Sequence, residues 1–155
     1  MITLATPEDA SVIHRVMLAA FEEYRHKAIP SSALSEKADS IRTSLNENEK
    51  AFLYWRGESA VGTVRFKEQD DAIYFFRLSV CPEERGRGIA GQLLQALEDY
   101  AAAYDFAVLC CQVRLSEIRN INLYKKNEFH ITDSETVVKP NGIHVETVTM
   151  TKNLW

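Results

Sequence analysis

The segment Arg85-Gly86-Arg87-Gly88-Ile89-Ala90-Gly91 lies between a predicted strand that ends near Val80 and a predicted helix with apolar residues at helical spacing. The first amides of a helix have no acceptor within the helix, and the helix dipole is positive at this end. Glycines let backbone amides approach an anion closely, and Arg85 and Arg87 add positive charge. The segment predicts a phosphate or diphosphate site, although an isolated short glycine motif is more often a solvated turn.

Two classes of nucleotide-binding protein share such glycines and are excluded. Gly86, Gly88 and Gly91 match the G-x-G-x-x-G fingerprint of dinucleotide folds, which need an acidic residue about 20 positions later for the ribose. The corresponding stretch, Leu109-Cys110-Cys111-Gln112, contains no acidic residue. A P-loop would need Gly-Lys followed by Ser or Thr, which is absent after this loop.

The rest of the sequence predicts the element order β-α-α-β-β-β-α-β-α-β-β. An antiparallel meander followed by a βαβ crossover gives an α/β (α+β) domain with three layers. Its central mixed sheet has about seven strands, with helices on both faces. No repeat or linker interrupts the chain, so residues 1–155 are expected to form one domain. Strands are expected at 1–5, 51–56, 60–66, 73–80, 106–113, 129–138 and 143–151, and helices after Thr6, at 34–45, after the glycine loop, and from Ser116 to Lys126.

Composition excludes several other classes of protein. The net charge of -4 and the absence of a run of Lys or Arg argue against nucleic-acid binding. The longest apolar stretch, Phe106–Cys111, is too short to cross a membrane, and the N-terminus lacks the basic segment of a signal peptide. Three cysteines, two of them adjacent, indicate free thiols in a reducing compartment. These features predict a cytoplasmic protein without a membrane partner.

Two segments of the chain resemble the GNAT superfamily of N-acetyltransferases. The family signature Arg/Gln-x-x-Gly-x-Gly/Ala is matched by Arg85, Gly88 and Ala90. Downstream, Asn120-Ile121-Asn122-Leu123-Tyr124-Lys125-Lys126-Asn127-Glu128-Phe129 is similar to the family segment x-I-x-L-Y-x-K-x-G-F. Both motifs stand in the family's order, and the predicted element order also matches, so the resemblance covers nearly the whole chain.

The resemblance implies how a cofactor, acetyl-CoA, would be held. The amides of Arg85–Gly91 would bind the CoA diphosphate, and strands 73–80 and 106–113 would splay apart to admit the cofactor. The backbone of Leu78 and Val80 would pair with the pantetheine arm, and an amide near Val80 would face the thioester oxygen. Asn120 would contact the pantetheine amides.

The resemblance also implies an activity, acetyl transfer to a primary amine of a small molecule or peptide by direct attack in a ternary complex. Tyr124 aligns with the general acid that protonates the departing thiolate, and no metal site is expected. Glu117 stands where many members have Asn, and here it is expected to favour the helix N-terminus. Glu128 replaces the usual Gly before Phe129, so Asn127 is expected to take the left-handed capping conformation.

The acceptor and the base are less defined. Many relatives keep a Glu on the strand that matches residues 73–80, but this strand contains no carboxylate. The acceptor pocket is expected between residues 21–34 and the closing hairpin. The candidates for recognition of a cationic amine are Glu22, Glu23 and Tyr24. The candidates for the base are His14 and His26.

Several alternatives stay open at this point. The missing strand carboxylate favours a non-catalytic CoA-binding sensor or interaction module of the same fold. An acyltransferase that uses a longer acyl-CoA would differ only in pocket size. Pairing of sheet edges between two copies would give a homodimer.

Overall fold

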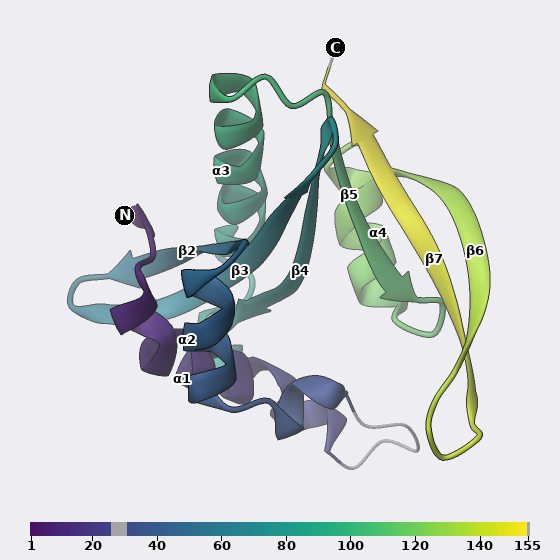
Figure 1. The fold of residues 1–155 in the computed structure, drawn as a ribbon, viewed down its shortest axis with the longest axis horizontal. Coiled ribbons are helices and arrows are strands. Elements are labelled where there is room, and N and C mark those ends of the chain that lie inside the picture. Colours follow the sequence, from purple (N-terminus) through teal and green to yellow (C-terminus); the bar gives the residue numbers. More distant parts are fainter. Residues whose placement is uncertain (26–30, 155) are drawn as a thin grey trace.

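The computed structural model describes residues 1–25 and 31–154, and within these ranges it contains a seven-stranded mixed sheet in the order β1-β2-β3-β4-β5-β7-β6. Helices cover both faces of this sheet (Figure 1), which confirms the three-layer fold that the sequence predicts. The strands are β1 (Ile2–Leu4), β2 (Glu49–Arg56), β3 (Ser59–Gln69), β4 (Ala72–Val80), β5 (Val108–Arg114), β6 (His130–Val138) and β7 (His144–Asn153). The helices are α1 (Ala10–Phe21), α2 (Ala38–Asn46), α3 (Ile89–Ala103) and α4 (Ile118–Lys126). Short 3-10 turns lie at Pro7–Asp9, Glu22–Tyr24, Ser32–Ser35 and Pro82–Glu84.

Each helical layer buries its own apolar cluster against the sheet. Ile13 and Met17 of α1 and Ile41 of α2 are fully buried beside Leu53 of β2. On the other face, α3 and α4 pack on the central strands. That cluster includes Leu93, Leu94 and Leu97 of α3, Tyr124 of α4, Phe66 of β3, Phe75 of β4 and Leu109 of β5. Burial of one apolar stripe per helix is what the spacing of these residues predicts.

The central feature of the sheet is the divergence of β4 from β5. These parallel strands pair only over Ala72–Tyr74 and Val108–Cys110, and they then separate (Figure 1). Beyond this point the pairing of β4 with β3 contains a bulge. Thr63 pairs with Ser79 and Arg65 pairs with Phe76, so β4 has one more residue than β3 between these two pairs. Such a bulge bends a strand and ends regular pairing. The splayed strands implied by the family resemblance are therefore present.

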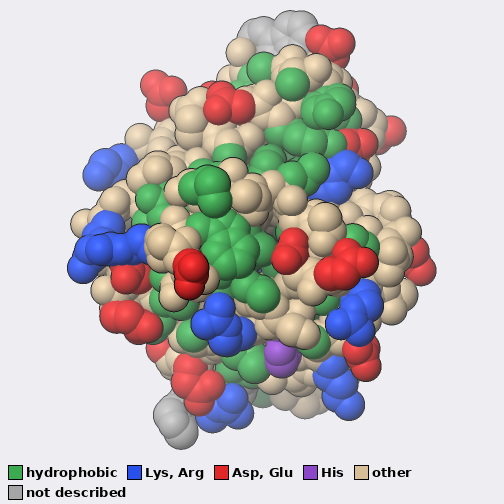
Figure 2. Space-filling model, turned by 90° about the vertical axis from the view of Figure 1, so that its left-hand side faces the viewer, with side chains coloured by type: hydrophobic (Ala, Val, Ile, Leu, Met, Phe, Trp, Pro, Cys, Tyr) green, Lys and Arg blue, Asp and Glu red, His purple; other side chains and the backbone are tan. Residues whose placement is uncertain are grey.

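Hydrophobic side chains gather on the side of the molecule shown in Figure 2, which faces left in Figure 1, where β1, β2 and α3 lie. A groove between these elements is lined by Ile2, Phe52, Tyr100 and Tyr104. The Tyr100 ring contacts the rings of both Phe52 and Tyr104. No described helix is long and apolar enough to cross a membrane. All three cysteines are free thiols, as the sequence predicts.

Two details of α4 differ from the prediction. The helix begins at Ile118, and Glu117 rather than Ser116 occupies the N-cap position. At its other end Asn127 keeps a right-handed φ of -95°, and Glu128 takes the left-handed conformation with φ of 72°. The amides of Glu128 and Phe129 donate to the carbonyls of Lys125 and Tyr124, so the chain reverses at Glu128, the position that usually holds Gly.

The left-handed Glu128 predicts that Glu128→Gly stabilises the protein. Relief of the steric strain on Cβ should raise the free energy of unfolding by about 1 kcal/mol in chemical denaturation. The Glu128 ion pair with Lys152 is 3.7 Å long and its carboxylate side chain is 84% exposed, so its loss costs little. Glu128→Ala removes the same charge and keeps the Cβ, and it should give no such gain. Equal stability of the two variants would contradict this explanation.

Candidate active site

Two cavities meet between the diverging strands. The loop cavity, of about 230 Å³, is bordered by Arg85 and Ala90. The strand cavity, of about 420 Å³, is bordered by residues 74–78 of β4 and 111–114 of β5. Five residues line both cavities and therefore mark the junction between them: Phe21, Tyr24, Leu78, Asn120 and Tyr124.

The glycine loop at the mouth of the loop cavity presents a row of backbone amides. Gly86 and Gly88 have φ of 81° and 79°, and the first amide of α3 with an intrahelical acceptor is that of Gln92, 3.1 Å from the Gly88 carbonyl. Among the described residues, no acceptor pairs with the six amides of residues 86–91. A Cβ on Gly86 or Gly88 would meet no atom within 4 Å, so the loop opens to solution. Such amides at a helix N-terminus suit an anion.

The two arginines of the loop differ in their surroundings. Arg85 donates to the Ala20 carbonyl at 3.0 Å, and its guanidinium lies 3.3 Å from the Glu23 carboxylate. It therefore ties the glycine loop to the end of α1. Arg87 lies 3.5 Å from Glu84 and its side chain is 54% exposed, so its charge stays on the solvent side of the loop.

The backbone of β4 faces the opening with unpaired groups. The Cys81 amide donates to the Val61 carbonyl on β3 at 2.9 Å. Because successive amides of a strand point to opposite edges, the Val80 amide points away from β3, to the side from which β5 has diverged. Leu78 and Val80 both line the loop cavity. This edge of β4 is thus available to an extended ligand.

Tyr124 lies at the junction of the two cavities and is only 7% exposed. Its ring contacts those of Phe75 and Phe129 at centroid distances of 5.7 and 5.8 Å. Burial raises the pKa of Tyr124 well above its ordinary value, so the phenol keeps its proton at neutral pH. No described residue forms a hydrogen bond with this hydroxyl group. Asn120, one turn earlier on α4, borders the same junction.

Glu117 is a site residue whose role the sequence did not reveal. Its carboxylate accepts a hydrogen bond from the Tyr24 hydroxyl at 2.9 Å, and Glu117 is the one carboxylate of the described residues that lines the strand cavity. Burial and this hydrogen bond raise the pKa of Tyr24 to about 12. The two residues are 93 positions apart, so no local sequence pattern indicates their contact.

None of the other predicted candidates that the structure describes lines the strand cavity. His14 lines neither cavity, and its Nε2 is 2.8 Å from the Glu36 carbonyl oxygen. Glu22 pairs with Arg25 on the surface. Glu23 borders the loop cavity and accepts hydrogen bonds from Arg119 at 2.6 Å and from Arg85 at 3.3 Å. His26 lies outside the described residues.

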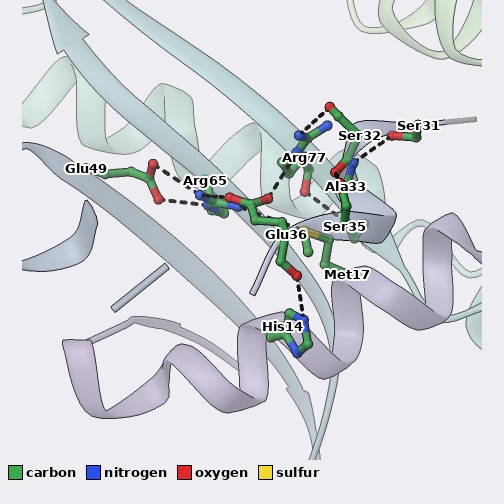
Figure 3. A network of polar contacts seen from close by, with 11 residues as sticks. His14, Met17, Ser31, Ser32, Ala33, Ser35, Glu36, Glu49, Arg65 and Arg77 are labelled. Atoms are coloured by element: carbon green, nitrogen blue, oxygen red, sulfur yellow. Dashed lines mark hydrogen bonds and ion pairs between the residues drawn. The ribbon is translucent and has the colours of Figure 1, made fainter. Parts of the chain in front are cut away.

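A buried ionic network supports one wall of the strand cavity (Figure 3). Arg65 is 2% exposed and binds Glu49 at 2.7 Å and Glu36 at 2.8 Å. Glu36 also lies 3.4 Å from Arg77, and although burial opposes it, these arginines hold the pKa of Glu36 below its ordinary value. Arg77 further donates to the Ser32 hydroxyl at 3.0 Å. The network thereby fixes Arg77, the residue with φ of 53° at the bulge of β4.

Comparison with known proteins identifies the family to which the chain belongs. The profile of the acetyltransferase (GNAT) family matches residues 13–129, which include the glycine loop and α4. The chain belongs to this family of acetyltransferases. No curated protein matches the sequence.

Solved structures share the fold at low sequence identity. A ribosomal-protein-alanine N-acetyltransferase from Brucella melitensis has 19% identity and a TM-score of 0.79, covering 99% of both chains. An acetyltransferase of the GNAT family from Streptococcus pneumoniae has 18% identity and a TM-score of 0.78, covering 99% of this chain and 98% of that chain. The putative acetyltransferase yncA from Salmonella typhimurium, solved with its cofactor acetyl-CoA, has 17% identity and a TM-score of 0.78, covering 100% of this chain and 94% of that chain.

The open glycine loop predicts that Gly88→Glu abolishes acetyl-CoA binding, because a carboxylate would occupy and repel the diphosphate site. Thermal unfolding with and without acetyl-CoA measures this, since a ligand that binds the native state raises the melting temperature. Gly57→Glu is a matched control: Gly57 has φ of 62° in the β2–β3 turn, and a Cβ there would also meet no atom within 4 Å. A cofactor-induced shift that persists in Gly88→Glu would contradict the assignment.

Proposed function

We propose that the protein is an acetyl-CoA-dependent N-acetyltransferase that acts on a primary amine. The observation that carries the proposal is the row of amides of Gly86–Gly91, which have no acceptor among the described residues and lie at the edge of a cavity lined by Arg85 and Ala90 that joins a second one at Tyr124. Membership of the acetyltransferase family supports a transferase that uses acetyl-CoA. The amine is that of a small molecule or peptide, and it enters through the strand cavity.

The described residues fit the cofactor along the loop cavity. The amides of Arg85–Gly91 would bind the diphosphate, and Arg85 and Arg87 place positive charge on either side of the loop. The edge of β4 at Leu78 and Val80 would pair with the pantetheine arm as a strand pairs with its neighbour. The Val80 amide would stabilise negative charge on the thioester oxygen, and Asn120 would hydrogen-bond a pantetheine amide.

Acetyl-CoA supplies the acetyl group as a thioester, whose C–S bond breaks as the acceptor nitrogen forms its new bond to carbon. An amine with a pKa near 10.4 is largely protonated at neutral pH, so a residue of the chain must accept its proton. Glu117 is placed to do so, because its carboxylate lines the strand cavity and contacts Tyr24 at the junction. In this proposal Glu117 takes the role of the carboxylate that β4 lacks. The absence of that carboxylate from β4 is what favours the alternative, a non-catalytic CoA-binding module.

Tyr124 would act as the general acid. Its ordinary pKa of about 10 exceeds that of a thiol by about 1.5 units, which makes proton transfer to a free thiolate uphill by roughly 2 kcal/mol. Burial raises the pKa of Tyr124 further. The same low-polarity surroundings would raise the pKa of a thiol there, so the difference between donor and acceptor need not widen.

Tyr124→Phe should lower kcat by about 100-fold and leave the acetyl-CoA dissociation constant nearly unchanged. The ring contacts with Phe75 and Phe129 are retained in this variant, and only the proton donor is lost. Release of free thiol measures kcat and calorimetry measures binding. Tyr104→Phe, at a ring that is 63% exposed on α3's C-terminal side, is the control. Unchanged turnover in Tyr124→Phe would remove Tyr124 as the acid.

Glu117→Gln should lower kcat/KM by about 100-fold at pH 7, because the proton acceptor is lost. The loss should shrink as the pH rises, since the deprotonated fraction of an amine with pKa near 10.4 grows about tenfold per pH unit below that value. Tyr24→Phe, which removes the hydrogen bond and keeps the carboxylate, is the control. A pH-independent loss in Glu117→Gln would assign Glu117 a positioning role instead.

Free thiols suit a reducing compartment, and we place the protein in the cytoplasm on that ground. Pairing of two copies through a sheet edge stays a prediction.

A further inference from the structure

The strand cavity carries an excess of positive charge. Among the described residues, its lining includes one carboxylate, Glu117, and cationic side chains from four different parts of the fold. These are Lys67 of β3, Arg77 of β4, Arg114 of β5 and Lys139 after β6. The chain as a whole has 22 acidic and 18 basic residues, so the cavity lining has the opposite bias from the overall composition. A cleft lined by one sign of charge concentrates ligands of the other sign.

Part of this positive charge is balanced within the protein. Arg65 and Arg77 share the carboxylate of Glu36, and Glu49 completes a group of two cations and two anions (Figure 3). Arg77 therefore adds hydrogen-bond donors to the cavity but little net charge.

Two lysines in the cavity lining are not balanced in this way. No described residue forms an ion pair with Lys67 or Lys139, and both are half-buried. The Lys67 ammonium lies 5.7 Å from the centroid of the Phe76 ring. The backbone of Lys139 is held in the β6–β7 turn, where its amide donates to the Ile143 carbonyl at 2.8 Å. Among the described residues, these two ammonium groups therefore have no ion-pair partner, and both can bind an anionic ligand.

The charges are also separated along the cavity. Glu117 contacts Tyr24, which lies at the junction with the loop cavity. Lys67 and Lys139 line the strand cavity alone and do not border the loop cavity. A ligand with a positive and a negative end would therefore place its amine at the junction and its negative end away from it.

We infer that the acceptor is a small primary amine that also carries an anionic group, a carboxylate or a phosphate. The anionic group would be bound by Lys67 and Lys139, and the amine would lie beside Glu117. A volume of about 420 Å³ suits a small molecule rather than a folded partner. The inference rests on the proposed function, because it assumes that the strand cavity receives the acceptor.

Calorimetry on the CoA-saturated protein tests this inference without turnover, using pairs of amines that differ by one anionic group. γ-Aminobutyrate is compared with γ-aminobutyramide, and O-phosphoethanolamine with ethanolamine, so that the two pairs distinguish carboxylate from phosphate. At least one of the amines with an anionic group should bind ten or more times more tightly than its partner without that group, and the difference should shrink with added salt. Amines with an anionic group that bind no better than their partners, or more weakly than spermidine or a peptide, would overturn the inference.

Variants then locate the anion site. Lys67→Gln and Lys139→Gln should each weaken binding of the preferred anionic amine several-fold and leave binding of its partner without the anionic group unaffected. Lys125→Gln, at an exposed lysine of α4 outside both cavities, is the matched control and should change neither. Equal effects of all three substitutions would contradict a local site.

The outcomes separate this inference from the proposed function. If acetyl-CoA neither stabilises the protein nor donates its acetyl group to any amine, the proposed function fails. If transfer occurs but amines without an anionic group are preferred, the proposed function stands and the anionic acceptor is wrong.

Discussion

The site depends on the separation of β4 from β5 after three paired residues. Two parallel strands that stayed paired would satisfy each other's amides and carbonyls and leave no room between them. Separation exposes the edge of β4 from Phe75 to Val80 and creates the cavities on either side of Tyr124. The rings of Phe75, Tyr124 and Phe129 pack together where the strands part, so burial of apolar surface compensates for lost strand pairing.

The bulge in β4 is held by interactions on the face of the sheet that α1 and α2 cover. Arg77 takes a left-handed conformation that is strained for a residue with a Cβ. Its guanidinium is bound by Glu36 and Ser32, and Glu36 is bound in turn by the buried Arg65. A buried ion pair of this kind is costly to break, because removal of one partner leaves an uncompensated charge. The buried ionic network therefore links the stability of the fold to the shape of the strand cavity.

Much of the fold could be predicted from sequence because its signals are local. Apolar spacing located α1, α2 and α3, and the glycine loop located the start of α3, since each depends on neighbouring residues alone. The end of α4 at Lys126 was predicted correctly, but the left-handed residue after it was not, because Asn127 continues the helical hydrogen bonding and Glu128 takes the strained conformation. A preference of Asn over Glu for that conformation was outweighed by the position of Phe129 in the core.

The acceptor side of the site could not be predicted in this way. Glu117 meets Tyr24 across the two halves of the molecule, and Lys67 and Lys139 come from a central strand and a distant turn. Each residue alone reads as an ordinary surface charge, and only the three-dimensional arrangement brings them to one cavity. The cofactor side was predictable by contrast, because backbone amides at a helix start need only a glycine-rich segment to be exposed.

The central claim is that these amides bind a diphosphate at the open edge of β4, and amide chemical shifts measured by NMR test it most directly. Addition of CoA should shift the amide signals of Gly86–Gly91 and Val80 most strongly. Addition of pantetheine, which lacks the diphosphate, should shift Val80 and leave the glycine loop largely unchanged. Loop signals that do not respond to CoA, or that respond equally to pantetheine, would contradict the account.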